Sequence, residues 1–226
     1  MTDDFKIREL AADRFWDYEN GYWWFGDPDR FAKSLAQAEI YQEVLGLPGT
    51  VAEFGVYKAN SLIRWLTIRD LYESVSSRSV LGFDAFGAFP QEKLNKVKSD
   101  RTSVKKFIDE GGDGLSVDEV DRVLNRKGFK NYELIQGNVF ETLPVFLERR
   151  AHEQFALINL DMDVYEPTRF VLEQLFERVV SGGLIVIDDF NTVAGATQAV
   201  NELLEKHPTL TLQKTGLYNT PSYIKK

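Results

Sequence analysis

Residues 155–163 read Phe-Ala-Leu-Ile-Asn-Leu-Asp-Met-Asp, and residues 182–190 read Gly-Gly-Leu-Ile-Val-Ile-Asp-Asp-Phe. Each stretch is a short apolar run that leads into two acidic residues. Short apolar runs bounded by turn residues are typical of parallel strands, which are buried on both faces. Because the carboxyl ends of parallel strands meet at one edge of a sheet, the two stretches predict an α/β fold with clustered acids at that edge.

Three further apolar runs, residues 50–55, 79–86 and 132–137, extend this pattern toward the N-terminus. Apolar residues at helical spacing predict helices at 29–45, from the first run to about 72, and at 139–150, 167–180 and 192–206. We expect a turn at residues 181–183 to lead into the last parallel strand. Residues 209–226 read as strand, turn, strand. The whole predicts a seven-stranded, mostly parallel sheet with helices on both faces and a C-terminal antiparallel hairpin, a layout that resembles the class I methyltransferase (Rossmann-like) fold.

Composition limits the classes of function. The net charge of −8 argues against nucleic-acid binding, which normally needs a basic face. There is no cysteine, so disulfides and thiolate chemistry are excluded. Apolar runs fall short of the roughly 18 residues that span a bilayer, and the N-terminus is too charged for a signal peptide, so we expect no membrane partner and a cytoplasmic protein. We expect a single domain over residues 1–226, with an N-terminal helical cap at 1–48.

Residues 85–130 are too long for a connection between strand and helix, which usually needs about two to six residues. We therefore expect a lid-like insertion. Its cations allow two interpretations, a solvated helix face or a lid that meets a phosphate-bearing substrate. They are Lys93, Lys96, Lys98, Arg101, Lys105 and Lys106.

The strand ends predict a ligand crevice. Gly55 lies where the first predicted strand becomes a helix, and a helix N-terminus offers free N–H groups to an anion such as a methionine carboxylate. Glu53 could neutralise the amine of that ligand. Asp84 ends the next strand, where a carboxylate can accept hydrogen bonds from two ribose hydroxyls, and Gly137-Asn138 falls where an adenine would lie. The alternatives are that Gly55 serves only packing and that Asp84 caps the next segment.

The acids at the other two strand ends favour a metal. Three carboxylates close together repel one another, and a hard divalent cation with oxygen ligands relieves that repulsion. Mg²⁺ suits such ligands best, whereas zinc is disfavoured without cysteine. The alternative is that these residues cap the helices and turns that follow, as Asp163 or Asp189 alone could do.

Five motifs look like those of the macrocin O-methyltransferase family, with a match from about residue 50 to 200. They are Glu-Phe-Gly-Val-Tyr at 53–57, Gly-Phe-Asp at 82–84, Thr-Leu-Pro at 142–144, Leu-Asp-Met-Asp-Val-Tyr-Glu-Pro-Thr at 160–168 and Gly-Gly-Leu-Ile-Val-Ile-Asp-Asp at 182–189. The resemblance implies that S-adenosylmethionine and Mg²⁺ are used to methylate a sugar hydroxyl. The acceptor would belong to a glycosylated natural product, a nucleotide sugar or a polysaccharide unit.

By that likeness Asp161, Asp188 and Asp189 hold the metal, and Asp163 is the general base. Together with the strand-end reasoning, it gives the following cofactor-binding residues: Glu53, Gly55, Val56, Tyr57, Ser61, Asp84, Ala85, Phe86, Gly137, Asn138 and Asp161. The related catechol O-methyltransferases use a lysine base shortly after the first metal ligand, which this chain lacks. Ala59-Asn60 also departs from the family, which often has glycines there. A catechol- or phenol-type methyltransferase and a non-catalytic nucleotide-binding module remain alternatives.

The N-terminal cap contains the aromatic segment 19–25, Glu-Asn-Gly-Tyr-Trp-Trp-Phe. Adjacent tryptophans are unusual on a free surface, and aromatic faces pack well against sugar C–H groups. We therefore expect Trp23 and Trp24 to contribute to the acceptor pocket. A hydrophobic clasp over the domain and a contact within a homo-oligomer are equally good interpretations.

Overall fold

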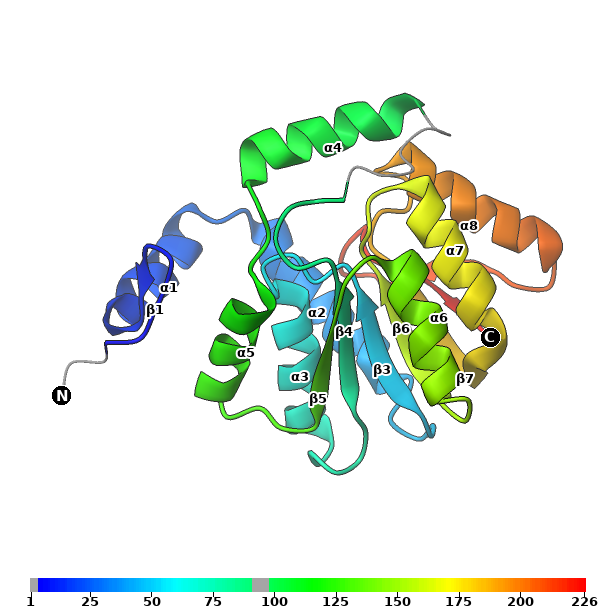
Figure 1. Ribbon diagram of the computed structural model, residues 1–226, viewed down its shortest axis with the longest axis horizontal. Helices are drawn as coiled ribbons and strands as arrows, with labels where there is room; N and C mark the ends of the chain where they lie inside the picture. The colour runs from blue at the N-terminus through cyan, green and yellow to red at the C-terminus, as the bar shows by residue number, and fades with distance from the viewer. Residues whose placement is uncertain (1–3, 91–97) are drawn as a thin grey trace.

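The computed structural model, which describes residues 4–90 and 98–226, has the predicted seven-stranded sheet (Figure 1). In spatial order the strands are β5 (Tyr132–Gln136), β4 (Val80–Asp84), β3 (Thr50–Phe54), β6 (Phe155–Leu160), β7 (Val179–Ile187), β9 (Ser222–Lys225) and β8 (Leu212–Lys214). Strands β5 to β7 in this order are parallel, and β9 is antiparallel to both β7 and β8. The C-terminal hairpin predicted from residues 209–226 is confirmed.

The strand order reverses between β3 and β6, which fixes where a ligand can bind. From β3 the chain moves outward to β4 and then β5, and it returns to the middle of the sheet to form β6 and β7. The loops after β3 and β6 therefore leave the sheet in opposite directions. Ligands of open parallel sheets bind in the crevice outside the carboxyl ends of the strands at this reversal.

Helices cover both faces of the sheet, and each face has its own apolar core. On one face lie α6 (Val139–Arg149), α7 (Tyr165–Leu175) and α8 (Ala194–Lys206), and on the other lie α2 (Pro28–Gln42), α3 (Asn60–Tyr72) and α5 (Val117–Arg126). The side chains of β7 alternate between these cores: Ile185 and Ile187 enter the first, and Leu184 and Val186 enter the second. This alternation explains why β7 reads as a continuous apolar run.

One prediction about β7 is wrong. Residues 181–183 form part of the strand, which begins at Val179, and not a turn that leads into it. Gly182 has a φ of +81°, and the pairing of β6 with β7 shifts register between Phe155 and Leu157. The Ser-Gly-Gly sequence therefore marks an irregularity inside a longer strand, where glycine tolerates the unusual backbone.

The N-terminal cap and the insertion contain short elements of their own. The cap has β1 (Lys6–Ile7), β2 (Leu10–Ala11), a 3-10 turn (Ala12–Arg14) and α1 (Phe15–Phe25), which Figure 1 shows at a distance from the sheet. The insertion has α4 (Lys98–Gly111) and α5, and α4 crosses above the sheet edge where the strands end (Figure 1). Lys93 and Lys96 lie outside the described residues. In the described ranges, each helix is too short or too polar to cross a membrane.

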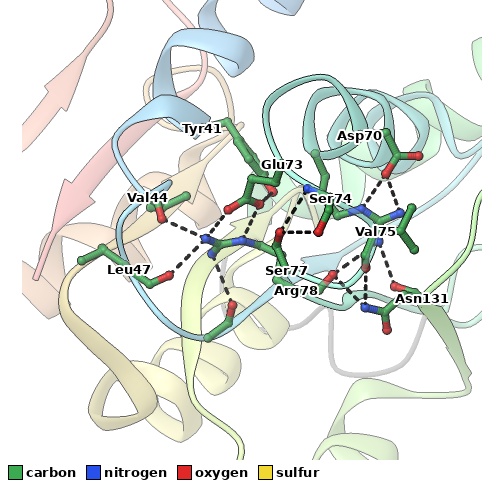
Figure 2. Close-up of polar contacts among 12 residues, drawn as sticks. Tyr41, Val44, Leu47, Asp70, Glu73, Ser74, Val75, Ser77, Arg78 and Asn131 are labelled. Carbon is green, nitrogen blue, oxygen red and sulfur yellow. Dashed lines mark hydrogen bonds and ion pairs between the residues drawn. The ribbon is translucent and has the colours of Figure 1, made fainter.

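A buried arginine joins several elements at the amino ends of the strands, on the side away from the crevice. Figure 2 shows Arg78 paired with both carboxylate oxygens of Glu73, each at 2.7 Å. The same guanidinium donates to the carbonyl oxygens of Val44 at 3.0 Å, Leu47 at 3.1 Å and Gly49 at 3.3 Å. Because these partners are the Glu73 side chain and backbone carbonyls, we assign Arg78 a role in the stability of the fold.

Candidate functional site

A cavity of about 400 Å³ lies at the carboxyl ends of the parallel strands. It brings together most of the residues predicted from the sequence: Gly55, Val56, Tyr57, Ser61, Asp84, Ala85, Gly137, Asn138, Asp161, Asp163, Asp188 and Asp189. Asp84 is the last residue of β4, and each of the others comes from a loop or helix start directly after one of the five parallel strands. The residues described as lining the cavity do not include Glu53, Phe86, Trp23 or Trp24.

Gly55 has a packing role that the sequence left open. Its φ of +93° suits glycine, and a Cβ at this position would collide with the carbonyl oxygen of Asp161. The loop after β3 and the loop after β6 therefore touch through the backbone, at the point where the strand order reverses. At the start of the following helix, Ala59 has a φ of +61°. This left-handed backbone explains why glycine is favoured there in the family that the motifs resemble.

Asp84 holds the loop after β3 in place. Its Oδ2 accepts hydrogen bonds from the backbone amides of Val56 at 2.7 Å and Tyr57 at 3.0 Å, and its Oδ1 accepts one from Phe86 at 2.6 Å. Two carboxylate oxygens offer about four acceptor positions, so Asp84 can still accept from a bound hydroxyl. Asn138 likewise has a local role, since its side chain accepts from the Phe140 amide at 3.1 Å and caps α6.

Glu53 lies fully buried behind the cavity. Its Oε1 accepts a hydrogen bond from Asn159 Nδ2 at 3.1 Å. Burial raises the pKa of Glu53 to about 8, although the Ser61 hydroxyl and the Arg64 guanidinium act in the opposite direction. Ser61 lines the cavity and also accepts from Gln37 Nε2 at 2.9 Å. Glu53 therefore lies behind the cavity and does not form its wall.

The acids after β6 and β7 form a tight cluster. Asp161, Asp163 and Asp189 each place a carboxylate oxygen within 4.8 Å of the others. Burial, followed by the nearby carboxylates, raises the pKa of Asp161 and Asp189 well above its ordinary range. Burial and the Asp188 carboxylate raise the pKa of Asp163 to about 6. Carboxylates held this close favour either a proton or a cation between them, and the all-oxygen set fits a hard divalent metal.

Asp163 reaches this cluster through a turn of the backbone and not through the strand, because β6 ends at Leu160. Asp163 has a φ of +63°, and its backbone amide donates to Asp189 Oδ2 at 3.0 Å. A single residue in left-handed conformation, which aspartate tolerates better than most, turns the side chain toward its neighbours.

Asp188 differs from the other acids because it has a cationic partner. Lys33 Nζ lies 2.6 Å from Asp188 Oδ2, and both side chains are largely buried. Burial lowers the pKa of Lys33, but the Asp188 and Asp161 carboxylates outweigh burial and raise this pKa above its usual value. The structure thus places Asp188 beside a lysine from α2, and the close group consists of Asp161, Asp163 and Asp189.

Sequence reasoning missed the cations of the cavity. Arg30 and Lys33 come from α2, Lys58 from the loop after β3, and Arg64 from α3. A signal for Lys33 was present. It lies four residues before the buried Gln37, in a helix that also buries Ala36 and Ile40, so a charged residue lies next to an apolar stripe.

Trp23 and Trp24 lie on α1, where they are 59% and 68% exposed. The ring of Trp23 packs against Phe31 of α2, with centroids 5.2 Å apart. Most of the aromatic surface of α1 faces solvent in a single chain, with Phe15, Trp16 and Phe25 at 57%, 69% and 84% exposure. The sequence prediction of an acceptor pocket at this pair therefore stays a prediction.

Solved structures of known proteins share this fold. The solved structure of the O-methyltransferase NovP superposes with a TM-score of 0.74 at 22% identity, covering 86% of this chain and 79% of that one. That of CalS11, a calicheamicin methyltransferase, gives a TM-score of 0.68 at 22% identity, covering 93% and 85%. Both likenesses confirm the class I methyltransferase fold.

Curated relatives are more informative about the reaction. The chain is 26% identical to demethyldecarbamoylnovobiocin O-methyltransferase of Streptomyces niveus, over 80% of this chain and 70% of that protein. It is 28% identical to mycinamicin III 3''-O-methyltransferase of Micromonospora griseorubida, over 72% of this chain and 63% of that protein. The family model for macrocin-O-methyltransferase (TylF) matches residues 28–216, which confirms the resemblance seen in the motifs. The chain is a methyltransferase, and it belongs to the macrocin-O-methyltransferase family.

Proposed function

We propose that this enzyme transfers a methyl group from S-adenosylmethionine to a sugar hydroxyl, with a divalent metal, preferably Mg²⁺, at the acidic cluster. The acceptor is a sugar of a glycosylated natural product, a nucleotide sugar or a polysaccharide unit. The single observation that carries this proposal is the cavity whose wall combines the loop after β3, Asp84 and the clustered acids. Two relatives support the acceptor class, because their names describe methylation at the 3'' position of mycinamicin III and at the 4' position of a rhamnosyl-tetracenomycin.

The cofactor would lie across the ends of β3, β4 and β5. The N-terminal turn of α3, which includes Ser61, supplies backbone amides for the methionine carboxylate. Asp84 would accept from the ribose hydroxyls while it holds the loop, and Gly137-Asn138 would adjoin the adenine. The acids after β6 and β7, which line the same cavity, would then be available to the acceptor and its metal.

For the metal we keep Asp161, Asp188 and Asp189 as ligands and Asp163 as the general base. The bound metal would supply positive charge that stabilises the developing alkoxide. Asp163 suits a base because burial raises its pKa to about 6, near the operating pH. The carboxylate would take the hydroxyl proton as the new O–C bond forms and the S–CH₃ bond breaks in line.

The proximity of Asp163 to Asp161 and Asp189 supports a competing assignment, in which Asp163 is a ligand and Asp188 remains with Lys33. Asparagine variants separate the two. If Asp163 is the base, Asp163→Asn lowers the rate by about 10²–10⁴-fold at every Mg²⁺ concentration, and Asp188→Asn recovers as Mg²⁺ is raised. If Asp163 is a ligand, Asp163→Asn is the variant that recovers as Mg²⁺ is raised, and Asp188→Asn does not.

The function itself is tested by methyl transfer to glycosides and nucleotide sugars, with Mg²⁺ and with chelator. We expect turnover only with metal. Full activity in excess chelator would remove the metal from the proposal. Methylation of catechols in preference to every sugar acceptor would contradict the substrate class.

A further inference from the structure

Asp100, near the start of α4, is a buried acid outside the cavity. Only 2% of its surface is exposed, although most of its helix is polar. Its Oδ2 accepts a hydrogen bond from the backbone amide of Tyr165 at 2.9 Å. The carboxylate also lies against Gly195 so closely that a Cβ there would collide with both of its oxygens. Asp100 therefore occupies a site shaped for a carboxylate.

The two contacts of Asp100 are the N-terminal turns of two helices. Tyr165 is the first residue of α7, and Gly195 is the second residue of α8. The residues that precede these helices are Val164 and Val193, and valine has no side-chain oxygen to cap a helix. A carboxylate satisfies free N–H groups and is favoured by the positive end of a helix dipole. Asp100 Oδ2 thus supplies from another element the cap that α7 lacks, and the same carboxylate lies against the first turn of α8.

The other end of α4 is attached to the cofactor side of the cavity. The carbonyl oxygen of Gly111, the last residue of α4, accepts from Tyr57 Oη and Lys58 Nζ, each at 2.7 Å. Tyr57 and Lys58 both line the cavity. Helix α4 therefore connects the loop after β3 with the start of α7, and Figure 1 shows it crossing above the sheet edge between these places.

The start of α7 is directly continuous with the acidic cluster, because Asp161 and Asp163 immediately precede Val164 and Tyr165. Fixing the Tyr165 amide limits the movement of this segment. We propose that Asp100 is a positioning residue, which caps α7, packs against the start of α8 and so holds both α4 and the segment with Asp161 and Asp163 in place beside the cavity. The proposal rests on the proposed function only in that the cavity binds S-adenosylmethionine.

Two substitutions disturb this cap from opposite sides. Asp100→Asn keeps the size but removes the charge and one acceptor, and Gly195→Ala keeps every charge while displacing the carboxylate. Matched controls are Asp109→Asn, an exposed acid on the same helix, and Gly46→Ala, where a Cβ would meet nothing within 4 Å. In the ligand-free protein, amide exchange at Tyr165 should be at least about tenfold faster in both test variants, because a hydrogen bond to a charged group is lost.

The second readout is the affinity for S-adenosylhomocysteine by calorimetry, measured well below the unfolding temperature of each variant. A positioning role predicts at least about fivefold weaker binding in both test variants and no change in the controls. About fivefold is the lower end of the usual coupling between two sites. A purely structural cap would lower Tm and leave this affinity unchanged.

Unchanged exchange at Tyr165, or affinity within about twofold of the original protein in both variants, would overturn the proposal. If Asp100→Asn does not fold, Gly195→Ala decides the outcome alone. If the unsubstituted protein itself does not bind S-adenosylhomocysteine, the proposed function fails and the positioning role fails with it. The exchange comparison uses no ligand, so it still decides whether Asp100 caps α7.

Discussion

Replacing Asp163 with asparagine should make the metal-free protein more stable, although it should make the enzyme less active. Asp163 lies in a cluster of carboxylates, and burial and the neighbouring Asp188 raise its pKa from 3.8 to about 6. The folded protein therefore disfavours the charged form of this residue relative to the unfolded chain. Asparagine has a similar shape, carries no charge and tolerates the left-handed backbone, with a φ of +63°, at this position.

The size and sign of the effect follow from the raised pKa. Between about pH 4 and pH 6 the native state holds more protons than the unfolded state, so stability falls as pH rises through this window. Above the window the full penalty applies. A shift of roughly two units corresponds to about 3 kcal/mol, because one unit is about 1.4 kcal/mol. For a chain of this length, about 3 kcal/mol is equivalent to a change in Tm of about 6–12 °C.

The assay is thermal unfolding in excess chelator at pH 4.5 and pH 8, values chosen as roughly the lower part of the window and above it. Asp163→Asn should have a higher Tm than the unsubstituted protein at pH 8, and the difference should shrink at the lower pH. Asp109→Asn, the same change at an exposed position, should show no such pattern. Equal or lower stability of Asp163→Asn at pH 8 would refute the raised pKa of Asp163, which burial and the Asp188 carboxylate are expected to cause.

Five further substitutions test other parts of the structure. Gly55→Ala should lower the free energy of unfolding by about 2 kcal/mol or more in denaturant titrations, because it adds backbone strain and a collision between two loops. Arg78→Ala should lower the same quantity by about 3–5 kcal/mol, because it leaves a buried carboxylate without its partner. Asp84→Asn should weaken S-adenosylhomocysteine binding by about 1.5–3 kcal/mol in calorimetry, and unchanged affinity would remove Asp84 from the site. Trp23→Ala and Trp24→Ala should raise the acceptor KM without changing cofactor affinity; an unchanged KM with altered sedimentation would instead assign the pair to a contact between copies.

The sheet was predictable because each of its strands carries its own signal. Buried parallel strands read as apolar runs, and the polar or acidic residues that follow mark their carboxyl ends. The site residues at these ends, from Gly55 to Asp189, were predictable for the same reason, because parallel topology alone brings the ends together. The error at residues 181–183 has a local cause, since Ser-Gly-Gly favours a turn in isolation, whereas in the structure the Gly182 amide donates to the Lys226 carbonyl and the Lys226 amide donates to that of Gly183.

The parts that sequence reasoning missed depend on contacts between distant segments. Lys33 approaches Asp188 across 155 positions of sequence, and Asp100 reaches Tyr165 across 65. Nothing in the local pattern around either residue names its partner. The displacement of Glu53 behind the cavity has a simpler basis. It falls inside β3, one residue before the strand ends at Phe54, so its side chain is enclosed between the sheet and α3 and does not reach the cavity wall.

Five consecutive residues, 161–165, connect these observations. The carbonyl of Asp161 packs against Gly55, the amide of Asp163 donates to Asp189, and the amide of Tyr165 donates to Asp100. Three separate elements thus fix the backbone of this segment, while its two carboxylates face the cavity. Like charges brought this close would spread apart on a flexible loop, so the cluster requires a rigid backbone. The proposed methyl transfer also needs a rigid backbone, because a base and a hydroxyl react efficiently only when they are held in the correct geometry. Loosening any one anchor should therefore reduce both the repulsion within the cluster and the rate of methyl transfer.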